Sequence, residues 1–135
     1  MKRSSSGAVA LLAFLIGCAT GPTYENYSGQ DAACVDGDTA NFMRHLSEGE
    51  AHVFILEIDG VRTKPREPVC LPPGNHQLKI RTHAFQAILD HYLDVRFEAG
   101  RKYLLRANFR DKAFVVEVMD ITAPPGTRVG TFRSK

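Results

Sequence analysis

Cysteines and histidines are the residues of this chain whose types and spacing could do the most specific chemistry. The three cysteines are Cys18, Cys34 and Cys70, and the five histidines are His45, His52, His76, His83 and His91. None of them falls into a C-x-x-C, H-x-H or H-x-x-x-H spacing, so the sequence predicts neither a redox pair nor a metal site. A hairpin of residues 77–84 and 89–97 could bring His83 and His91 together, although solvated or hydrogen-bonded strand histidines are the favoured interpretation.

The carboxylates give no clearer sign of catalysis. The acidic residues that could supply an acid/base pair are Glu57, Asp59, Asp90, Asp94, Glu117 and Asp120. Nothing in their spacing fixes two of them together, and Asp59 is better explained by a turn. No serine stands in a G-x-S-x-G elbow, and no glycine-rich phosphate loop is present. We therefore predict that the chain is not an enzyme and binds no cofactor.

The N-terminus is built like an export signal. Lys2 and Arg3 precede an apolar run from Ala8 to Ile16, and the segment closes on Leu15-Ile16-Gly17-Cys18. The run is far shorter than the roughly 20 residues that a membrane-spanning helix needs. The closing tetrapeptide resembles the lipobox of bacterial lipoproteins, in which the cysteine becomes the first residue of the mature protein.

This resemblance implies a lipid anchor on Cys18. The thiol would carry a diacylglycerol, cleavage would follow Gly17, and the freed amine would be acylated too, which together hold a protein firmly on a membrane. In Gram-negative lipoproteins the absence of an aspartate after the cysteine favours the outer membrane, and here Ala19 follows it. We predict a signal peptide over residues 1–17 and an outer-membrane anchor, with the protein on the periplasmic face. The alternative is an uncleaved or conventionally cleaved signal with a stray cysteine.

Lipidation of Cys18 would leave Cys34 and Cys70 as a pair. Exported chains fold in an oxidising compartment, and an even number of cysteines there favours a disulfide. We therefore predict a Cys34–Cys70 bridge. The alternative is two buried free thiols that behave as small apolar residues.

The charge balance limits the partners. The chain carries a formal net charge of +2, which Lys2 and Arg3 account for. A neutral mature chain argues against a nucleic-acid partner and against a polybasic membrane patch.

The densest basic stretch holds Arg62, Lys64 and Arg66, which could touch anionic lipid headgroups, lipopolysaccharide or peptidoglycan carboxylates. The alternative is a solvated edge that discourages edge-to-edge pairing, and Pro65 and Pro68 favour this alternative.

The rest of the chain is dominated by period-two alternation of apolar residues. Alternating stretches cover residues 51–58, 77–84, 89–97, 103–109 and 114–118, and turn signals such as Asp59-Gly60, Pro72-Pro73-Gly74 and Arg110-Asp111-Lys112 separate them. This pattern predicts an all-β fold, a single antiparallel β-sandwich of about six to eight short strands over residues 31–121. Residues 18–30 form a polar tether and residues 122–135 an irregular tail. Residues 37–50 fit a short helical turn or an irregular extended segment.

A second resemblance covers roughly residues 51–118. Ile58-Asp59-Gly60, then Leu71-Pro72-Pro73-Gly74 followed by His76 and Leu78, and a later Ala99-Gly100 opening the strand of Tyr103, are similar to PEGA-type β-sandwich modules. The name-giving tetrapeptide is absent, because the corner here is Leu-Pro-Pro-Gly. The resemblance implies the same sandwich, with the Tyr103 hydroxyl reaching a backbone group. It says nearly nothing about activity.

These observations predict a lipid-anchored, non-enzymatic envelope protein. Its role would be structural, accessory or binding, and an envelope protein or polysaccharide is the expected partner, with strand addition at a sheet edge as one mode. One alternative is a binding module for envelope polysaccharide or lipid, although the absence of tryptophan disfavours a sugar-stacking surface. The other alternative is a small hydrolase or inhibitor.

Overall fold

A computed structural model describes residues 21–39, 49–85 and 87–134. The predicted signal peptide and Cys18 lie outside the described residues, and so does most of the 37–50 segment, including Phe42, Met43 and Leu46. Within the described part of the chain, no helix is long and apolar enough to span a bilayer.

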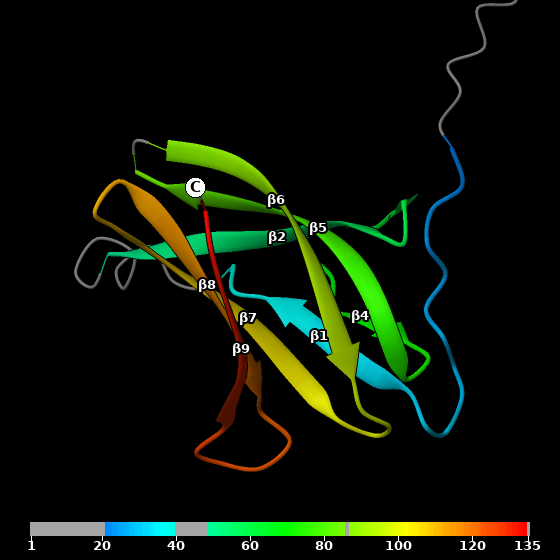
Figure 1. Ribbon diagram of the computed structural model, residues 1–135. Helices are drawn as coiled ribbons and strands as arrows, with labels where there is room; N and C mark the ends of the chain where they lie inside the picture. The colour runs from blue at the N-terminus through cyan, green and yellow to red at the C-terminus, as the bar shows by residue number, and fades with distance from the viewer. Residues whose placement is uncertain (1–20, 40–48, 86, 135) are drawn as a thin grey trace, which may run out of the picture.

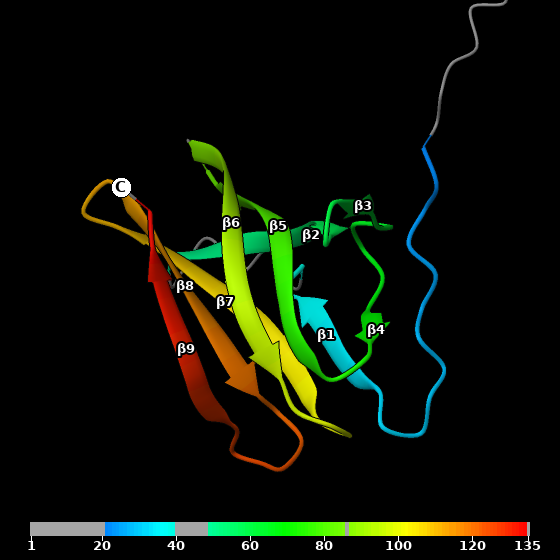
Figure 2. The same ribbon diagram turned by 45° about the vertical axis from the view of Figure 1, so that its right-hand side comes forward.

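The described residues form an all-β fold of nine strands, which confirms the predicted fold class. The strands are β1 Ala33–Gly37, β2 Glu50–Ile58, β3 Val61–Arg62, β4 Val69–Leu71, β5 Gly74–Ala84, β6 Ala87–Phe97, β7 Lys102–Arg110, β8 Ala113–Asp120 and β9 Thr127–Arg133. One hydrogen-bonded network joins all nine. It is folded into two layers, as Figures 1 and 2 show.

The two layers meet at strand β2. One layer holds β3, β2, β5 and β6, and the other holds β4, β1, β7, β8 and β9. Strand β2 pairs with β5 over most of its length, but Glu50 and Ala51 pair with β7. Strand β2 therefore turns the corner of the sandwich, and β4, β6 and β9 lie at the ends of the network.

The core lies between the layers and follows the predicted alternation. Apolar residues at every second position of the long strands point inward, because successive side chains of a strand face opposite sides. The largest fully buried side chains are Phe97, Phe114, Ile55, Ile58, Leu71, Leu78, Ile80 and Leu105. Phe97 packs edge-to-face on Tyr103 at 4.9 Å between ring centroids. The Tyr103 hydroxyl accepts a hydrogen bond from the Glu98 amide at 2.9 Å, as the resemblance implied.

The tight turns lie where the sequence predicts them. Asp59 and Gly60, with φ of 49° and 79°, connect β2 to β3. Positive φ at both central residues is the geometry of a type I′ hairpin, and glycine adopts it at little steric cost.

One pairing departs from the antiparallel prediction. Strand β1 pairs antiparallel with β4 but parallel with β7, so the sheet is mixed. Alternation of apolar residues reports which face a side chain occupies and says nothing of strand direction. Consecutive strands joined by tight turns must run antiparallel, whereas β1 and β7 are far apart in the sequence and are free to run together.

The prediction of an irregular tail over residues 122–135 is wrong. Residues 127–133 form β9, which pairs antiparallel with β8. Pro124-Pro125-Gly126 is therefore the connection between two strands. The strand is hard to recognise because its inward positions are Gly130 and Phe132, and only Phe132 packs against the core.

The described part of the predicted tether also departs from expectation. The Thr23 backbone forms a parallel bridge with Arg62, and the Tyr24 and Tyr27 amides donate to the carbonyls of Arg62 and Cys70. Residues 23–27 therefore belong to the folded domain and run beside β3 and β4 (Figure 1). Composition marked the segment as a linker, but regularly spaced backbone groups can still pair with an open edge.

Candidate functional site: the N-terminal segment and its cleft

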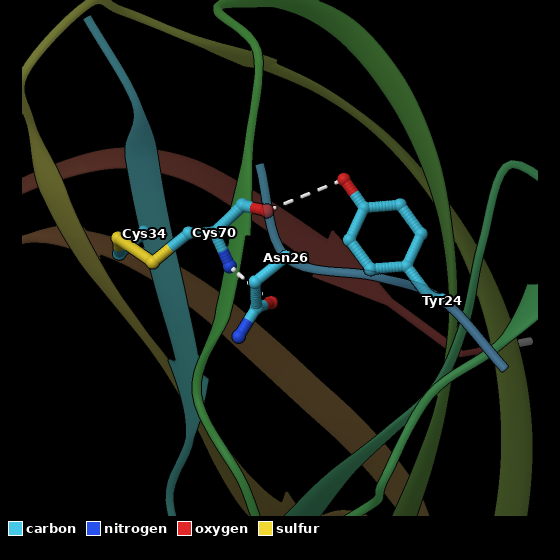
Figure 3. The surroundings of a disulfide bond; sticks show 4 residues. All are labelled: Tyr24, Asn26, Cys34 and Cys70. Carbon is cyan, nitrogen blue, oxygen red and sulfur yellow. Dashed lines mark hydrogen bonds between the residues drawn. A yellow bond between two sulfur atoms is a disulfide. The ribbon is translucent and has the colours of Figure 1, made fainter. Parts of the chain in front are cut away.

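The disulfide is the chemical centre of this region. Cys34 of β1 and Cys70 of β4 are cross-strand neighbours, and their sulfur atoms are bonded. The structure thus confirms the predicted bridge, which links the edge strand β4 to its neighbour β1. Figure 3 shows the bond beside the N-terminal segment.

The N-terminal segment saturates the backbone of Cys70. The Cys70 amide donates to Asn26 Oδ1 at 2.9 Å, and the Cys70 carbonyl accepts from the Tyr27 amide at 2.9 Å. The Tyr24 hydroxyl donates to the same carbonyl at 3.3 Å (Figure 3). An unpaired strand edge would expose these groups, so the segment closes the β4 edge. Sequence reasoning missed Asn26 altogether, because an asparagine in a turn-rich stretch carries no sign of a distant partner.

Tyr24 is held as a donor by its surroundings. Partial burial raises the pKa of its hydroxyl, and the negative charge of Asp59 raises it further. The hydroxyl therefore keeps its proton at physiological pH and its hydrogen bond to Cys70 persists. This contact joins the N-terminal segment to the same strand that carries the disulfide.

A cleft of about 550 Å³ lies between the N-terminal segment and the loop before β4. Residues 22–26 form one wall and residues 63–64 and 67–69 the other. Its charged residues are Glu25, Lys64 and Glu67, and the Lys64 ammonium lies 3.5 Å from the Glu67 carboxylate. The cleft is therefore open and carries more acidic than basic side chains.

The predicted basic stretch is not gathered into one site. Arg62 lies exposed in β3, where its carbonyl accepts from the Tyr24 amide. Lys64 pairs with Glu67, and the Arg66 guanidinium lies over the Phe54 ring at 5.9 Å from its centroid. Two of the three cations thus already have partners in the domain.

His76 links two corners of the same end of the sandwich. Its Nδ1 lies 2.6 Å from Asp59 Oδ2, and its Nε2 lies 2.7 Å from the Pro72 carbonyl oxygen. Each ring nitrogen therefore meets a hydrogen-bond acceptor. Burial alone would raise the pKa of Asp59, but hydrogen bonds from His76 and the Gln77 amide, with the positive charge of His76, lower it below its usual value. The group fastens the β2–β3 turn to the start of β5.

The two histidines that a hairpin could have brought together lie on opposite faces. His83 and His91 are in paired strands, but His83 points outward while His91 points toward the core and contacts Thr82 and Phe114. Among the described residues, no cluster of three or more histidine, cysteine or carboxylate side chains could hold a metal ion.

His91 gives the domain a predictable pH dependence. Burial lowers its pKa below the usual 6.5, against a weaker opposing effect of Asp90. Its Nε2 lies 2.7 Å from the hydroxyl of the fully buried Thr82. The unfolded chain therefore takes up a proton near pH 6.5 that the folded chain resists, so stability present at neutral pH is lost as the pH falls.

We expect urea unfolding to show this loss between about pH 7 and about pH 5. His91→Gln retains a hydrogen-bonding side chain without the titrating ring, so the loss in the variant should be smaller. The other histidines are common to both proteins and cancel in the comparison. Equal slopes of stability against pH for the two proteins would contradict a neutral, buried His91.

Comparisons of the chain with protein-family models, with curated proteins and with solved structures find no match. A functional proposal must therefore rest on the residues of this chain. The most informative are those at its N-terminal end, where a predicted acylation site precedes a segment that is fixed to the domain from Thr23 onward.

Proposed function

We propose that this chain is a non-enzymatic lipoprotein of the cell envelope, held on the periplasmic face of the outer membrane by acylated Cys18. The observation that carries the proposal is the tetrapeptide Leu15-Ile16-Gly17-Cys18 at the end of an export-type segment. The fold supports it, because a disulfide-bonded all-β domain suits an oxidising compartment.

The position of the domain edge sharpens the proposal. Residues 23–27 are hydrogen-bonded to the domain, so the chain has no more than five residues between Cys18 and its first contact with the domain among the described residues. Five residues can span at most about 18 Å when fully extended. An acylated Cys18 would therefore keep the domain against the membrane surface, where a structural, accessory or binding role toward neighbouring envelope components is the natural one.

The arrangement of titratable groups supports a non-enzymatic role. His76 and Asp59 are bonded to each other and to backbone groups at a turn, and His91 is bonded to a buried threonine. Such contacts hold turns and strands in place. A catalytic or tight small-molecule site requires buried polar groups that converge on it, and the described residues that line the open cleft beside Tyr24 provide none.

A second candidate function is the binding of an anionic envelope component by Arg62, Lys64 and Arg66. It is favoured by the position of Lys64 on the rim of the cleft beside the N-terminal segment, close to the proposed anchor. It has weaker support than the first, because Lys64 and Arg66 already have partners. The proposed envelope role does not depend on it.

Replacing Cys18 with serine is expected to release the protein from membranes. The thiol is the proposed attachment point of the lipid, and two or more acyl chains supply nearly all of the binding energy. Fractionation after a high-salt wash should move the variant from the membrane pellet to the soluble fraction, and metabolic labelling with palmitate should fail. The double variant Cys34→Ser/Cys70→Ser is the control, because it removes the other thiols and should stay in the pellet. A Cys18→Ser chain that still pellets and still incorporates palmitate would refute the anchor.

A further inference from the structure

The exposed apolar side chains of the domain are concentrated on the β5–β6 hairpin. Phe85 in its turn is 76% exposed, Ile88 and Tyr92 are each 63% exposed, and Leu89 is 41% exposed. These four are most of the large apolar side chains that the described residues leave in solvent, the others being Tyr27, Ile121 and Val129. A cluster of this kind at a projecting hairpin marks a surface that contacts another apolar phase.

The acidic residue nearest the tip of the hairpin is neutralised. Asp90 lies two residues beyond Ile88 and accepts two hydrogen bonds from Arg81, at 2.7 and 3.0 Å. Such a two-bond contact is the strong form of the arginine–carboxylate pair. Farther from the tip, Tyr92 lies beneath the Lys79 ammonium, 5.7 Å from the ring centroid. The hairpin therefore presents apolar side chains first, then a compensated pair, then an aromatic ring and a lysine that is itself paired with Glu57 of β2.

Basic side chains flank the same end of the molecule. Arg110 and Lys112 belong to the β7–β8 turn and Arg133 to the end of β9, and all three are exposed. None of the ion pairs found among the described residues involves them. In both views this turn and the C-terminal strand end lie beside the β5–β6 hairpin (Figures 1 and 2). The only acidic residue within that turn is Asp111, so the flank carries a net positive charge.

The hairpin tip and the start of the described chain lie at the same height on opposite sides of the domain (Figures 1 and 2). Figures 1 and 2 are related by a rotation about the vertical axis, and in both the blue start of the chain and the hairpin tip reach the upper margin of the domain. Cys18 precedes this start by three residues, a reach of at most about 11 Å. A single plane along that margin can therefore meet the anchor and the hairpin together.

We propose that the tip of the β5–β6 hairpin, formed by Phe85, Ile88 and Leu89, inserts into the headgroup region of the anionic bilayer to which Cys18 is anchored. This inference rests on the proposed lipid anchor. Interfacial elements bury their apolar side chains by roughly 5–10 Å. At about 3.3 Å per residue, Ile88 lies some 13 Å nearer the tip than Tyr92, so the three tip residues insert while Tyr92 and Lys79 stay near the headgroups.

Charge supplies the second half of the interaction. Arg110, Lys112 and Arg133 face the anionic headgroups when the tip is inserted, and each cation near an anionic surface adds to binding. Because Asp90 is paired with Arg81, it brings no uncompensated negative charge to that surface. The contact fixes the orientation of the domain, because the anchor and the hairpin meet the bilayer at two separate points.

A second copy of the chain along the β6 edge is the competing occupant. The outward residues of β6 include Asp90 and Asp94, and charged side chains on an edge strand discourage strand addition. The lipid surface is therefore the occupant that the charges favour.

The test uses the full acylated chain in vesicles of phosphatidylethanolamine and phosphatidylglycerol that carry a photoactivatable diazirine lipid. After irradiation and tryptic digestion, labelling of residues 82–96 is compared with labelling of residues 113–128, which hold the exposed Ile121. We expect at least about fivefold more label on the hairpin peptide, because insertion keeps it among the lipids. Phe85→Ser/Ile88→Ser should cut that label by at least about tenfold, because the burial of even one large apolar side chain is worth about a tenfold change in an equilibrium. Val129→Ser is the matched control and should leave the hairpin label unchanged.

The outcomes separate the hairpin from the anchor. The mass of the peptide that begins at Cys18 reports the acyl chains independently of the photolabel. An acylated N-terminal peptide with equal label on residues 82–96 and 113–128 would overturn hairpin insertion and leave the anchor intact. A labelled hairpin on a chain without acyl groups would remove the anchor and support the contact. Weak hairpin label together with crosslinks between residues 82–96 of two copies would overturn insertion in favour of a dimer.

Discussion

Substitution of Gly37 by alanine is expected to lower the free energy of unfolding by about 3 kcal/mol or more. Gly37 ends β1 and is buried against β2. A Cβ atom there would overlap the carbonyl oxygen of Val53, which is itself fully buried. Because the obstacle is backbone, no rotamer change can relieve the overlap. The two strands would have to separate, breaking the hydrogen bond from the Val53 amide to the Asp38 carbonyl.

Urea unfolding of the two proteins measures this cost directly. Gly21→Ala is the matched control, because a Cβ at position 21 would meet no atom within 4 Å. We expect the control to unfold at the same urea concentration as the unmodified protein, and Gly37→Ala to unfold at a much lower one or to be unfolded in buffer. A Gly37→Ala protein of unchanged stability would mean that β1 and β2 do not approach as closely as the structure has them.

The parts of the fold that the sequence predicts are those where local chemistry decides the outcome. In β5, the residues Leu78, Ile80, Thr82 and Ala84 share a face in the sequence pattern, and all four are buried. The Asp59-Gly60 turn was predictable for a similar reason, because few dipeptides adopt positive φ so readily. Strand alternation and tight turns are each decided by a few neighbouring residues, so the local sequence is enough to predict them.

The parts that the sequence does not predict depend on distant partners. Strand β9 alternates poorly because Gly130 occupies an inward position, so only its pairing with β8 defines it. The parallel pairing of β1 with β7 joins segments far apart in the chain. Residues 23–27 have linker composition, yet their backbone pairs with edges that β3 and β4 leave open. In each case the decisive hydrogen bonds are tertiary, and no local pattern encodes them.

In the candidate site, too, one part could be predicted from the sequence and another part could not. The Cys34–Cys70 bridge could be predicted, because only two cysteines remain after Cys18 and an exported pair tends to bond. The role of Asn26 could not be predicted, because its side-chain oxygen accepts a hydrogen bond from the amide of Cys70, which is distant in the sequence. His76 and Asp59 were each predicted as turn or strand residues. Their mutual bond depends on two corners that meet only once the sandwich is folded.

Reduction of the Cys34–Cys70 disulfide is expected to cost about 3–4 kcal/mol of stability in the chain-entropy model, because the bond closes a span of 36 residues. The double variant Cys34→Ala/Cys70→Ala should show the same loss without reductant and no further change with it. Urea unfolding with and without dithiothreitol measures both. A reduced protein as stable as the oxidised one would show that the bridge adds nothing to the fold.

The loss should be felt first in the N-terminal segment. Strand β4 has three residues, and its pairing with β1 is reinforced by the bond that joins the two. When the disulfide is reduced, β4 can separate from β1. The Cys70 backbone, which bonds Asn26, Tyr24 and Tyr27, then moves away with β4. Hydrogen exchange at the Cys70 and Tyr27 amides should therefore accelerate on reduction more than exchange in β5. In the proposed lipoprotein, release of residues 23–27 would lengthen the tether after Cys18 and let the domain move away from the membrane.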